Sequence, residues 1–225
     1  MTGRLVVFEG VEGGGKTTQI QRSQQWLAES GWLEFLQTQG YVRGVVQTRE
    51  PGGTSLGQEL RHVLLNYAGA EPLTDRTELL LYAADRAQHV EGYLRPLLAA
   101  DTLILCDRYT DSTVAYQGYG RQLDLALIDQ LNHIATNGLQ SDLTLWFDLP
   151  VELGLARTRQ RGASDRIEQA DLTFHQRVQH GFQALAQQFP QRIIPIDASQ
   201  PAATVAAQVQ NILHTHLSRW YAPLP

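Results

Sequence analysis

The sequence has little of three features that would each narrow its function: cysteine, basic charge and long apolar runs. Its single cysteine, Cys106, excludes a disulfide within the chain and suits a reducing compartment. No apolar run approaches the roughly 18 residues that a membrane-spanning helix needs. The first residues lead directly into a strand pattern and lack the regions of a signal peptide. We therefore predict a cytoplasmic protein without a membrane partner.

Basic residues are outnumbered by acidic ones. The 225 residues include 18 basic and 23 acidic side chains, a net charge of -5, whereas a general nucleic-acid binder usually has a basic excess. We therefore predict no nucleic-acid partner, although local basic clusters can still bind small anions. Of the 18 basic residues, 17 are arginine and only Lys16 is lysine. Lysine provides a flexible point charge that a planar guanidinium does not replace, so we expect Lys16 to serve the chemistry.

A glycine-rich segment near the N-terminus carries the clearest functional signal. Residues 10–17 read Gly-Val-Glu-Gly-Gly-Gly-Lys-Thr and form a phosphate-binding loop pattern between an apolar run and a helical stretch. Glycine N–H groups can converge on phosphates because no Cβ obstructs them, and the helix N-terminus adds positive potential. Lys16 would neutralise the β- and γ-phosphates, and Thr17 would place a hydroxyl on Mg²⁺. The predicted ATP-binding residues are Gly10, Val11, Glu12, Gly13, Gly14, Gly15, Lys16, Thr17 and Thr18.

Five short apolar runs alternate with helical patterns along the chain. The runs are largely continuous, as in parallel strands that helices cover on both faces. Strands are predicted at 4–9, 44–48, 102–107, 143–149 and 192–197. Helices are predicted at 16–30, 55–65, 74–99, 123–137, 151–160, 169–188 and 201–220. This order predicts a single α/β domain over residues 1–225, in which a five-stranded parallel sheet lies between helices in three layers.

Two stretches depart from this regular alternation. Residues 31–43 form a long connection that contains several aromatics, which could be a helical extension or an extra turn. Residues 157–171 are rich in arginine and interrupted by Gly162. The composition of the second stretch is that of a mobile lid that closes over phosphates.

Polar motifs follow the second and third predicted strands. Residues 48–54 read Thr-Arg-Glu-Pro-Gly-Gly-Thr, and residues 107–118 read Asp-Arg-Tyr-Thr-Asp-Ser-Thr-Val-Ala-Tyr-Gln-Gly. Ligands bind at the carboxyl ends of strands in open parallel sheets, so we expect both motifs beside the phosphate loop. Together the three motifs closely resemble the bacterial thymidylate kinase (dTMP kinase) family, over residues 4 to about 201. The resemblance implies the P-loop NTPase fold.

Charged residues in these motifs could bind phosphate and Mg²⁺. Arg49 and Arg108 each follow a strand end and could hold a monophosphate between two guanidinium groups. Either arginine could instead pair with its neighbouring carboxylate, Glu50 or Asp107. Asp107 is also placed to hold a Mg²⁺ water together with Thr17, or to cap a turn.

The resemblance implies how the acceptor nucleotide is held. Tyr82 and Arg86 project from one face of the 74–99 helix, four residues apart. The family positions that they match stack on the thymine ring and hydrogen-bond its carbonyl, and Tyr82 replaces the phenylalanine that is common there. Tyr116 matches the position that crowds the sugar 2′ carbon and disfavours ribose. The remaining acceptor residues of the matched motif are Ser112, Thr113 and Gln117.

The arginine that stabilises the transferring phosphoryl group is expected in the lid. Some family members place a basic residue inside the phosphate loop, but residues 11–14 here contain none. We predict Arg161 and Arg166 as catalytic, with Lys16 and Arg108, and interpret Arg157 and Arg159 as solvated helix residues. The resemblance further implies that Glu12 accepts a hydrogen bond from the acceptor 3′-hydroxyl. Residues 197–201 are expected to border the adenine.

The sequence therefore predicts an ATP- and Mg²⁺-dependent kinase that converts dTMP to dTDP, and the resemblance adds a homodimer. One alternative is a kinase for another nucleotide or nucleoside, although a purine site would need a roomier pocket. A second is a nucleotide-dependent switch protein, but the chain has no Asn-Lys-x-Asp motif for guanine. A third is a nucleotide-binding protein without activity, against which the intact Lys16, Thr17, Asp107 and Arg108 argue.

Overall fold

A parallel sheet of five strands organises the chain. The computed structural model describes residues 3–160, 162 and 165–224. Its strands are β1 (Arg4–Glu9), β2 (Gly44–Arg49), β3 (Thr102–Asp107), β4 (Leu143–Asp148) and β5 (Ile193–Asp197), in the order β2-β3-β1-β4-β5. All neighbouring pairs run parallel. Because β1 is central, the loop that follows it opens in the middle of the carboxyl edge, where such sheets bind ligands.

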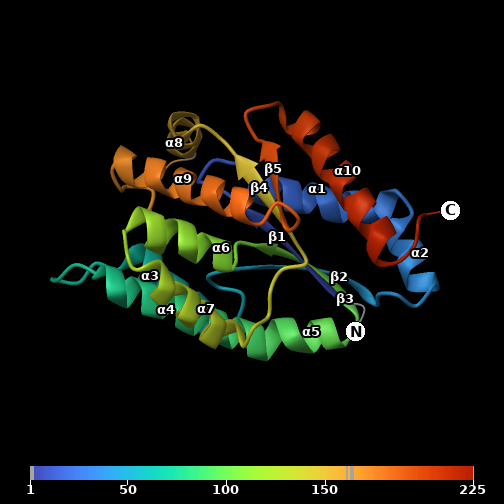
Figure 1. Cartoon of the computed structure of the whole chain (residues 1–225), viewed down its shortest axis with the longest axis horizontal. Helices are drawn as coiled ribbons and strands as arrows, with labels where there is room; N and C mark the ends of the chain where they lie inside the picture. Colours follow the sequence, from blue (N-terminus) through green and yellow to red (C-terminus); the bar gives the residue numbers. More distant parts are fainter. Residues whose placement is uncertain (1–2, 161, 163–164, 225) are drawn as a thin grey trace.

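Helices connect the strands and cover both faces of the sheet (Figure 1). They are α1 (Lys16–Glu29), α2 (Trp32–Thr38), α3 (Ser55–Asn66), α4 (Asp75–His89), α5 (Arg95–Ala99), α6 (Thr110–Thr113), α7 (Leu125–Thr136), α8 (Val151–Arg159), α9 (Leu172–Gln188) and α10 (Ala202–Trp220). Two π-helical turns, η1 (Val90–Leu94) and η2 (Val114–Gly120), continue α4 into α5 and extend α6. The predicted three-layer α/β arrangement is confirmed.

The core forms because successive side chains of β1 point to opposite faces of the sheet. Val6 and Phe8 pack in the cluster that includes residues of α1 and α10. Leu5 and Val7 instead pack against η1 and α5. All four side chains are fully buried, and each such burial contributes roughly 1.5–3 kcal/mol. The central strand is thereby fixed on both sides.

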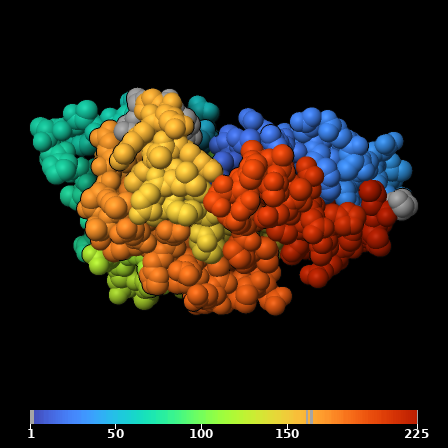
Figure 2. Space-filling view, turned by 90° about the horizontal axis from the view of Figure 1, so that it is seen from above, coloured from blue at the N-terminus to red at the C-terminus, as the bar shows by residue number. Residues whose placement is uncertain are grey.

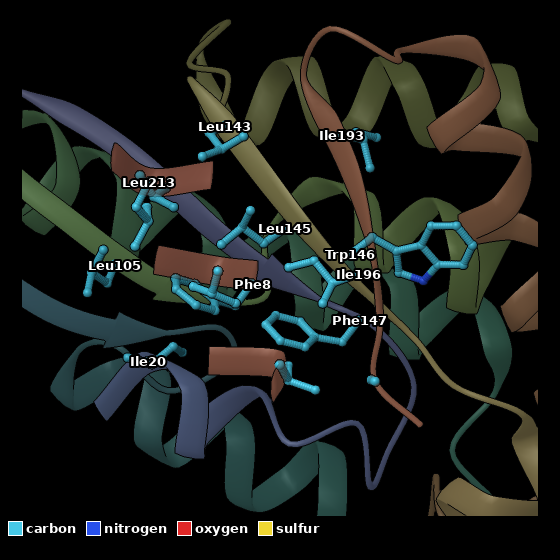
Figure 3. Packing of buried hydrophobic residues seen from close by; sticks show 14 of the residues in the cluster. Phe8, Ile20, Leu105, Leu143, Leu145, Trp146, Phe147, Ile193, Ile196 and Leu213 are labelled. Carbon is cyan, nitrogen blue, oxygen red and sulfur yellow. The ribbon is translucent and has the colours of Figure 1, made fainter. Parts of the chain in front are cut away.

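Aromatic side chains extend the core across β4. Phe147 stacks on Phe8 with ring centroids 5.9 Å apart, and Trp146 stacks on Phe182 of α9 at 6.4 Å. Figure 3 shows Phe8 and Phe147 side by side, with Trp146 set apart from them. Because adjacent residues of a strand face opposite ways, α9 covers the face opposite to α1.

Side-chain caps explain where several helices begin. Thr54, Thr74, Asp124 and Asp171 each accept a hydrogen bond from the N–H three residues later, at the starts of α3, α4, α7 and α9. Such a cap contributes on the order of 1 kcal/mol, because it satisfies an N–H group that the helix itself leaves open.

Several element boundaries differ from the sequence prediction. The observed β2 and β5 end or begin one residue later than expected, and α9 begins at Leu172 rather than 169. The predicted 74–99 helix contains the π-helical turn η1. The helical run α6–η2 was not predicted, because its many small, β-branched and glycine residues have low helix propensity.

The 31–43 connection contains a short helix, α2, which agrees with the predicted alternative of a helical extension. α2 buries Trp32, whose Nε1 donates to His214 Nδ1 of α10 over 3.2 Å. Figure 2 shows α10, in red, beside the blue segment that contains α1 and α2. The aromatics of this connection therefore pack the N-terminal part of the chain against α10. Within the part of the chain that the structure describes, no helix has the length and apolarity to cross a bilayer.

Candidate functional site

Two adjoining pockets lie at the carboxyl edge of the sheet. The loop pocket is lined by residues 12–18 and by Asp107. The inner pocket is lined by residues of α3, α4 and α6–η2, including Tyr82, Arg86 and Tyr116. Glu12, Glu50, Arg61, Arg108 and Asp165 line both pockets. The predicted phosphate-loop and acceptor residues are therefore brought together, as expected for motifs that follow parallel strands.

The phosphate loop has the backbone shape that its glycines allow. Gly13 has φ 77°, and a Cβ there would lie 2.4 Å from the Gly154 carbonyl oxygen. Gly15 has φ 84° and begins α1, which no side chain among the described residues caps. The first N–H groups of α1 are therefore available to an anion in the loop pocket.

Lys16 lies folded against its own loop. Its Nζ donates to the carbonyl oxygens of Gly10 and Val11 over 2.8 and 3.0 Å. Burial lowers the pKa of Lys16 to about 8, because the charged ammonium loses hydration. An anion in the loop pocket would favour the charged form, so Lys16 is placed to exchange its two carbonyls for phosphate oxygens.

Glu12 and Arg108 form an ion pair at the junction of the two pockets. Arg108 Nη2 donates to Glu12 Oε1 over 2.6 Å, and the Tyr116 hydroxyl donates to Glu12 Oε2 over 2.6 Å. Burial disfavours the charge on Glu12, but Arg108 and Lys16 outweigh it and keep the Glu12 pKa below its usual value. The Arg108 guanidinium also lies 4.9 Å above the centre of the Tyr116 ring. A carboxylate and a guanidinium thus stand where ligands of the two pockets would meet.

Glu9 holds the segment that carries Arg108. Its Oε1 accepts from the N–H groups of Tyr109 and Ser112 over 2.8 and 3.1 Å, and its Oε2 accepts from Ser112 Oγ over 2.6 Å. Ser112 Oγ in turn accepts from Arg108 Nη1. Arg108 has φ 71°, a conformation that non-glycine residues rarely adopt, and these bonds hold it there. Glu9 was not predicted as a site residue, although a carboxylate that ends a buried strand is a signal for one.

The surroundings of Glu9 raise the pKa of its carboxyl group. Burial raises its pKa to about 7, and the nearby Asp111 carboxylate adds to this, while Arg108 and the hydrogen bonds oppose it. Glu9 is fully buried, so its bonds to Tyr109 and Ser112 are not exchanged for water.

Arg86 lies at the base of the inner pocket and is bonded on three sides. Its Nε donates to Glu50 Oε2, its Nη1 to Thr113 Oγ1 and Asn132 Oδ1, and its Nη2 to the Tyr109 carbonyl oxygen. Each of these distances is 2.8–3.0 Å. The predicted residue Thr113 therefore holds Arg86. The half-buried Tyr82 lines the pocket one helical turn before Arg86, as their spacing predicts.

Gln117 and Arg166 meet at Glu78 of α4. Gln117 Nε2 donates to Glu78 Oε1 over 2.8 Å, and Arg166 pairs with Glu78 Oε2. Arg166 Nε also donates to the Leu64 carbonyl oxygen. In this conformation the side chain that we predict to be catalytic is anchored to Glu78 and Leu64 and lines neither pocket, so a role at the transferring phosphate requires it to move.

Of the other arginines in the predicted lid, one is bonded to the phosphate loop where a solvated side chain was expected. Arg157 was interpreted as a solvated helix residue, but its Nη1 donates to the carbonyl oxygens of Gly13 and Ala198 over 3.3 and 3.1 Å. It therefore links the phosphate loop to the end of β5, because α8 packs directly behind the loop. Arg159 is exposed, and Arg161 lies outside the described residues.

Arg49 and Arg61 supply further positive charge around the loop pocket. Arg49 is exposed and lines this pocket, as predicted. Arg61 of α3 was not predicted; it lines both pockets, and its Nη1 donates to the Pro51 carbonyl oxygen over 3.0 Å. Burial and the neighbouring Arg49 lower the Arg61 pKa. A phosphate bound there would offset this repulsion.

Thr17 and Asp107 are the residues that fit a magnesium ion. Thr17 Oγ1 donates to Asp107 Oδ2 over 3.2 Å, and both face the loop pocket. No cluster of three histidine, cysteine or acidic side chains among the described residues could hold a metal by itself. A hydroxyl and a single carboxylate suit Mg²⁺, which keeps several waters and takes phosphate oxygens as further ligands.

Comparison with known proteins places this arrangement in a family. A family model described as thymidylate kinase matches residues 8–209. The chain belongs to the thymidylate kinase family. It is 61% identical to a thymidylate kinase of Cyanothece sp. (strain PCC 7425 / ATCC 29141), over 98% of this chain and 97% of the relative. It is 56% identical to one of Nostoc punctiforme (strain ATCC 29133 / PCC 73102), over 96% and 98%, and 53% identical to one of Acaryochloris marina (strain MBIC 11017), over 98% and 100%.

Membership of the thymidylate kinase family confirms several predictions. The chain is a kinase with a P-loop NTPase fold, and ATP and dTMP are the substrates of this enzyme class. The match covers the phosphate loop, the motifs at residues 48–54 and 107–118, and the predicted lid.

Proposed function

We propose that the chain transfers the γ-phosphoryl group of ATP to dTMP at the junction of the two pockets. The observation that carries this assignment is the Glu12–Arg108 pair, which lines the loop pocket and the inner pocket at once. ATP in the loop pocket and dTMP in the inner pocket would approach each other there. Because both phosphates would be held in place, the acceptor oxygen attacks the γ-phosphorus directly and the bond to the β-phosphate oxygen breaks, which yields dTDP and ADP.

The loop pocket supplies the donor half of the site. N–H groups of residues 13–18 surround the β-phosphate, and Lys16 neutralises the β- and γ-oxygens. We assign residues 10–18 to ATP, with the base beside residues 197–201. Mg²⁺, held by Thr17 and through water by Asp107, would neutralise phosphate charge when bound.

The inner pocket supplies the acceptor half. Tyr82 stacks on the thymine ring, and Arg86 donates its remaining N–H to a base carbonyl. Tyr116 crowds the 2′ carbon of the sugar, while Glu12 accepts from its 3′-hydroxyl. Ser112, Thr113 and Gln117 border the nucleotide. Ser112 accepts from Arg108, Thr113 accepts from Arg86, and Gln117 donates to Glu78. Arg49 and Arg108, with Arg61 beside them, hold the dTMP phosphate.

The lid completes the site. Charge spreads over the three equatorial oxygens during transfer, and an arginine there accelerates the reaction by about 10³–10⁵-fold. We assign this role to Arg161 or Arg166 of a lid over residues 157–171 that moves within the single domain 1–225. Closure excludes water, so that ATP is not hydrolysed instead.

A coupled assay of ADP formation tests the function. ATP and Mg²⁺ are supplied with one monophosphate at a time: dTMP, dUMP, dCMP, dAMP, dGMP or UMP. We expect the highest kcat/KM with dTMP. Equal values for the six acceptors would refute the substrate assignment, and ADP formation without any acceptor would indicate an ATPase.

We also propose a cytoplasmic homodimer that forms through α3, α4 and α7. These helices lie along one side of the molecule (Figure 1) and expose Leu56, Leu80 and Ile134, the last to 74%. Large apolar side chains that are exposed on adjacent helices can form a protein interface. Light scattering should give a dimer for the wild type and a monomer for Ile134→Asp. Asn211→Asp, on exposed α10, is the matched control; a monomeric wild type would contradict the proposal.

A further inference from the structure

A chain of polar side chains lies behind Arg86, and all of its members are buried except the half-buried Thr48. His89 Nδ1 bonds to Glu50 Oε1 over 2.8 Å, and Glu50 Oε2 accepts from Arg86 Nε over 2.8 Å. On the far side of the ring, His89 Nε2 bonds to Thr48 Oγ1 over 2.7 Å. We call Thr48, His89, Glu50 and Arg86 the His89 relay. It connects the last turn of α4 to the base of the inner pocket through the residue that follows β2.

The relay determines where Arg86 points. A guanidinium has five N–H donors in a fixed plane, and four of those on Arg86 have partners. The fifth, on Nη2, is left for the inner pocket, as far as the described residues show. Glu50 is the only charged partner in this set, so its orientation has the largest influence on the guanidinium plane.

His89 is suited to fix the Glu50 carboxylate. An ionised carboxylate only accepts hydrogen bonds, so His89 Nδ1 carries the proton toward Glu50. His89 is fully buried and Glu50 is 4% exposed, so water does not readily replace this bond. Close packing also holds the ring, since a Cβ on Gly53 would lie 2.5 Å from His89 Nε2.

We propose that His89 is a positioning residue for base selection, acting through Glu50 on Arg86. The proposal rests on the assignment of dTMP to the inner pocket. Thymine presents a carbonyl oxygen where cytosine presents an amino group, so a rigidly held N–H donor favours dTMP over dCMP. If His89 no longer fixes Glu50, Arg86 reorients and this discrimination falls, whereas the phosphate loop is untouched.

Two substitutions separate the contacts of the His89 ring. His89→Asn keeps a side-chain N–H at the place of Nδ1, facing Glu50. His89→Gln can reach the place of Nε2, facing Thr48, but loses the donor to Glu50. The readouts are kcat, KM for dTMP and for ATP, and the inhibition constant of dCMP in competition with dTMP.

We expect His89→Gln to raise KM for dTMP about tenfold, the usual scale for losing a hydrogen bond to a charged group. Its dCMP inhibition constant, kcat and ATP KM should stay within about twofold of wild type, and His89→Asn should resemble wild type throughout. The matched control is His175→Gln, since His175 of α9 is also buried but lies outside the relay; it should leave the dTMP-to-dCMP ratio unchanged.

Other outcomes would overturn the proposal. These are an unchanged KM for dTMP in His89→Gln, an equal rise in His89→Asn, or an equal weakening of dTMP and dCMP. If His89→Gln does not fold, Glu50→Gln is measured instead; it should raise KM for dTMP while the dCMP constant stays unchanged, and wild-type values would refute the relay. A wild type that does not prefer dTMP would refute the proposed function itself, which is a distinct result.

Discussion

The loop pocket and the inner pocket are built in different ways. Half of the residues that line the loop pocket form one continuous segment, residues 12–18, whose backbone N–H groups face a bound anion. The inner pocket combines side chains from α3, α4, α6–η2 and the loop after β2. Buried hydrogen bonds already fix Arg86, whereas Lys16 must exchange its present partners for phosphate.

This difference indicates how the two halves contribute to the reaction. The loop pocket binds phosphate groups that every nucleotide has, so its residues should affect the rate of transfer more than the choice of acceptor. The inner pocket has a prearranged set of donors and rings, so its residues should affect acceptor affinity and discrimination. Substitutions in each half can therefore test whether the two pockets contribute in these different ways.

The largest effect is expected from Lys16. Lys16→Ala should lower kcat at least about 10²–10³-fold, because the charge on the transferring phosphate loses its nearest cation. Lys16→Arg should also be strongly impaired, since a planar guanidinium does not fit the same loop. KM for dTMP should change by less than about threefold, because Lys16 does not line the inner pocket. Steady-state kinetics measures both constants, and a rise in dTMP KM as large as the fall in kcat would contradict the separation of the two pockets.

Arg108 should affect both halves, because it stands between them. Arg108→Lys keeps the charge but loses the planar guanidinium, whose two Nη atoms donate to Ser112 and to Glu12. We expect kcat to fall and KM for dTMP to rise, for a combined loss of about 10²-fold in kcat/KM. The same assay measures this. A change confined to either constant would show that Arg108 belongs to one pocket only.

Tyr116 tests discrimination by the sugar. Tyr116→Ala should lower the kcat/KM ratio of dTMP over its ribose analogue about tenfold, because the ring no longer crowds the 2′ position. Tyr116→Phe is the matched control: it loses the bond to Glu12 but keeps the ring, so this ratio should stay near wild type. If both variants relax the ratio equally, the hydroxyl rather than the ring makes the selection.

A further effect, outside the reaction itself, concerns stability behind the inner pocket. Asp85 Oδ1 accepts from the Gly52 N–H, but its Oδ2 is buried without a partner among the described residues. Burial and the neighbouring Glu50 raise the Asp85 pKa to about 6. The folded state therefore favours the protonated form, and stability is lost as pH rises from the unfolded pKa near 4 to above 6.

Asp85→Asn should consequently be more stable than wild type at pH 8 by about 1–3 kcal/mol, and the gain should shrink toward pH 4. Urea unfolding at both values measures this. Asp129→Asn, on the exposed face of α7, should show no such trend. A gain that is equal at both pH values would mean that Asp85 is not protonated in this range.

Much of the fold and of the loop pocket could be predicted from local sequence. The strand runs are continuous and apolar, and the phosphate loop is a contiguous motif whose geometry depends on its own glycines. Tyr82 and Arg86 were indicated by the family resemblance, and both line the inner pocket.

The parts that were missed depend on contacts between distant residues. Glu9 bonds the segment after β3, 100 residues later, and nothing near Glu9 indicates that partner. His89 reaches Glu50 across 39 positions, and Arg157 reaches Gly13 across 144. The packing of α2 likewise depends on α10. Such pairings follow from the folded topology, so the local sequence does not indicate which distant residue is the partner.

The most direct test of the account is a competition among acceptors. Equal concentrations of dTMP, dUMP, dCMP, dAMP and dGMP are incubated with the wild-type protein, ATP and Mg²⁺, and the diphosphates are separated by mass. We expect dTDP to predominate from the first time points, with ADP formed in equal amount to the total of the acceptor diphosphates. Comparable amounts of the five diphosphates, or a different predominant product, would contradict it.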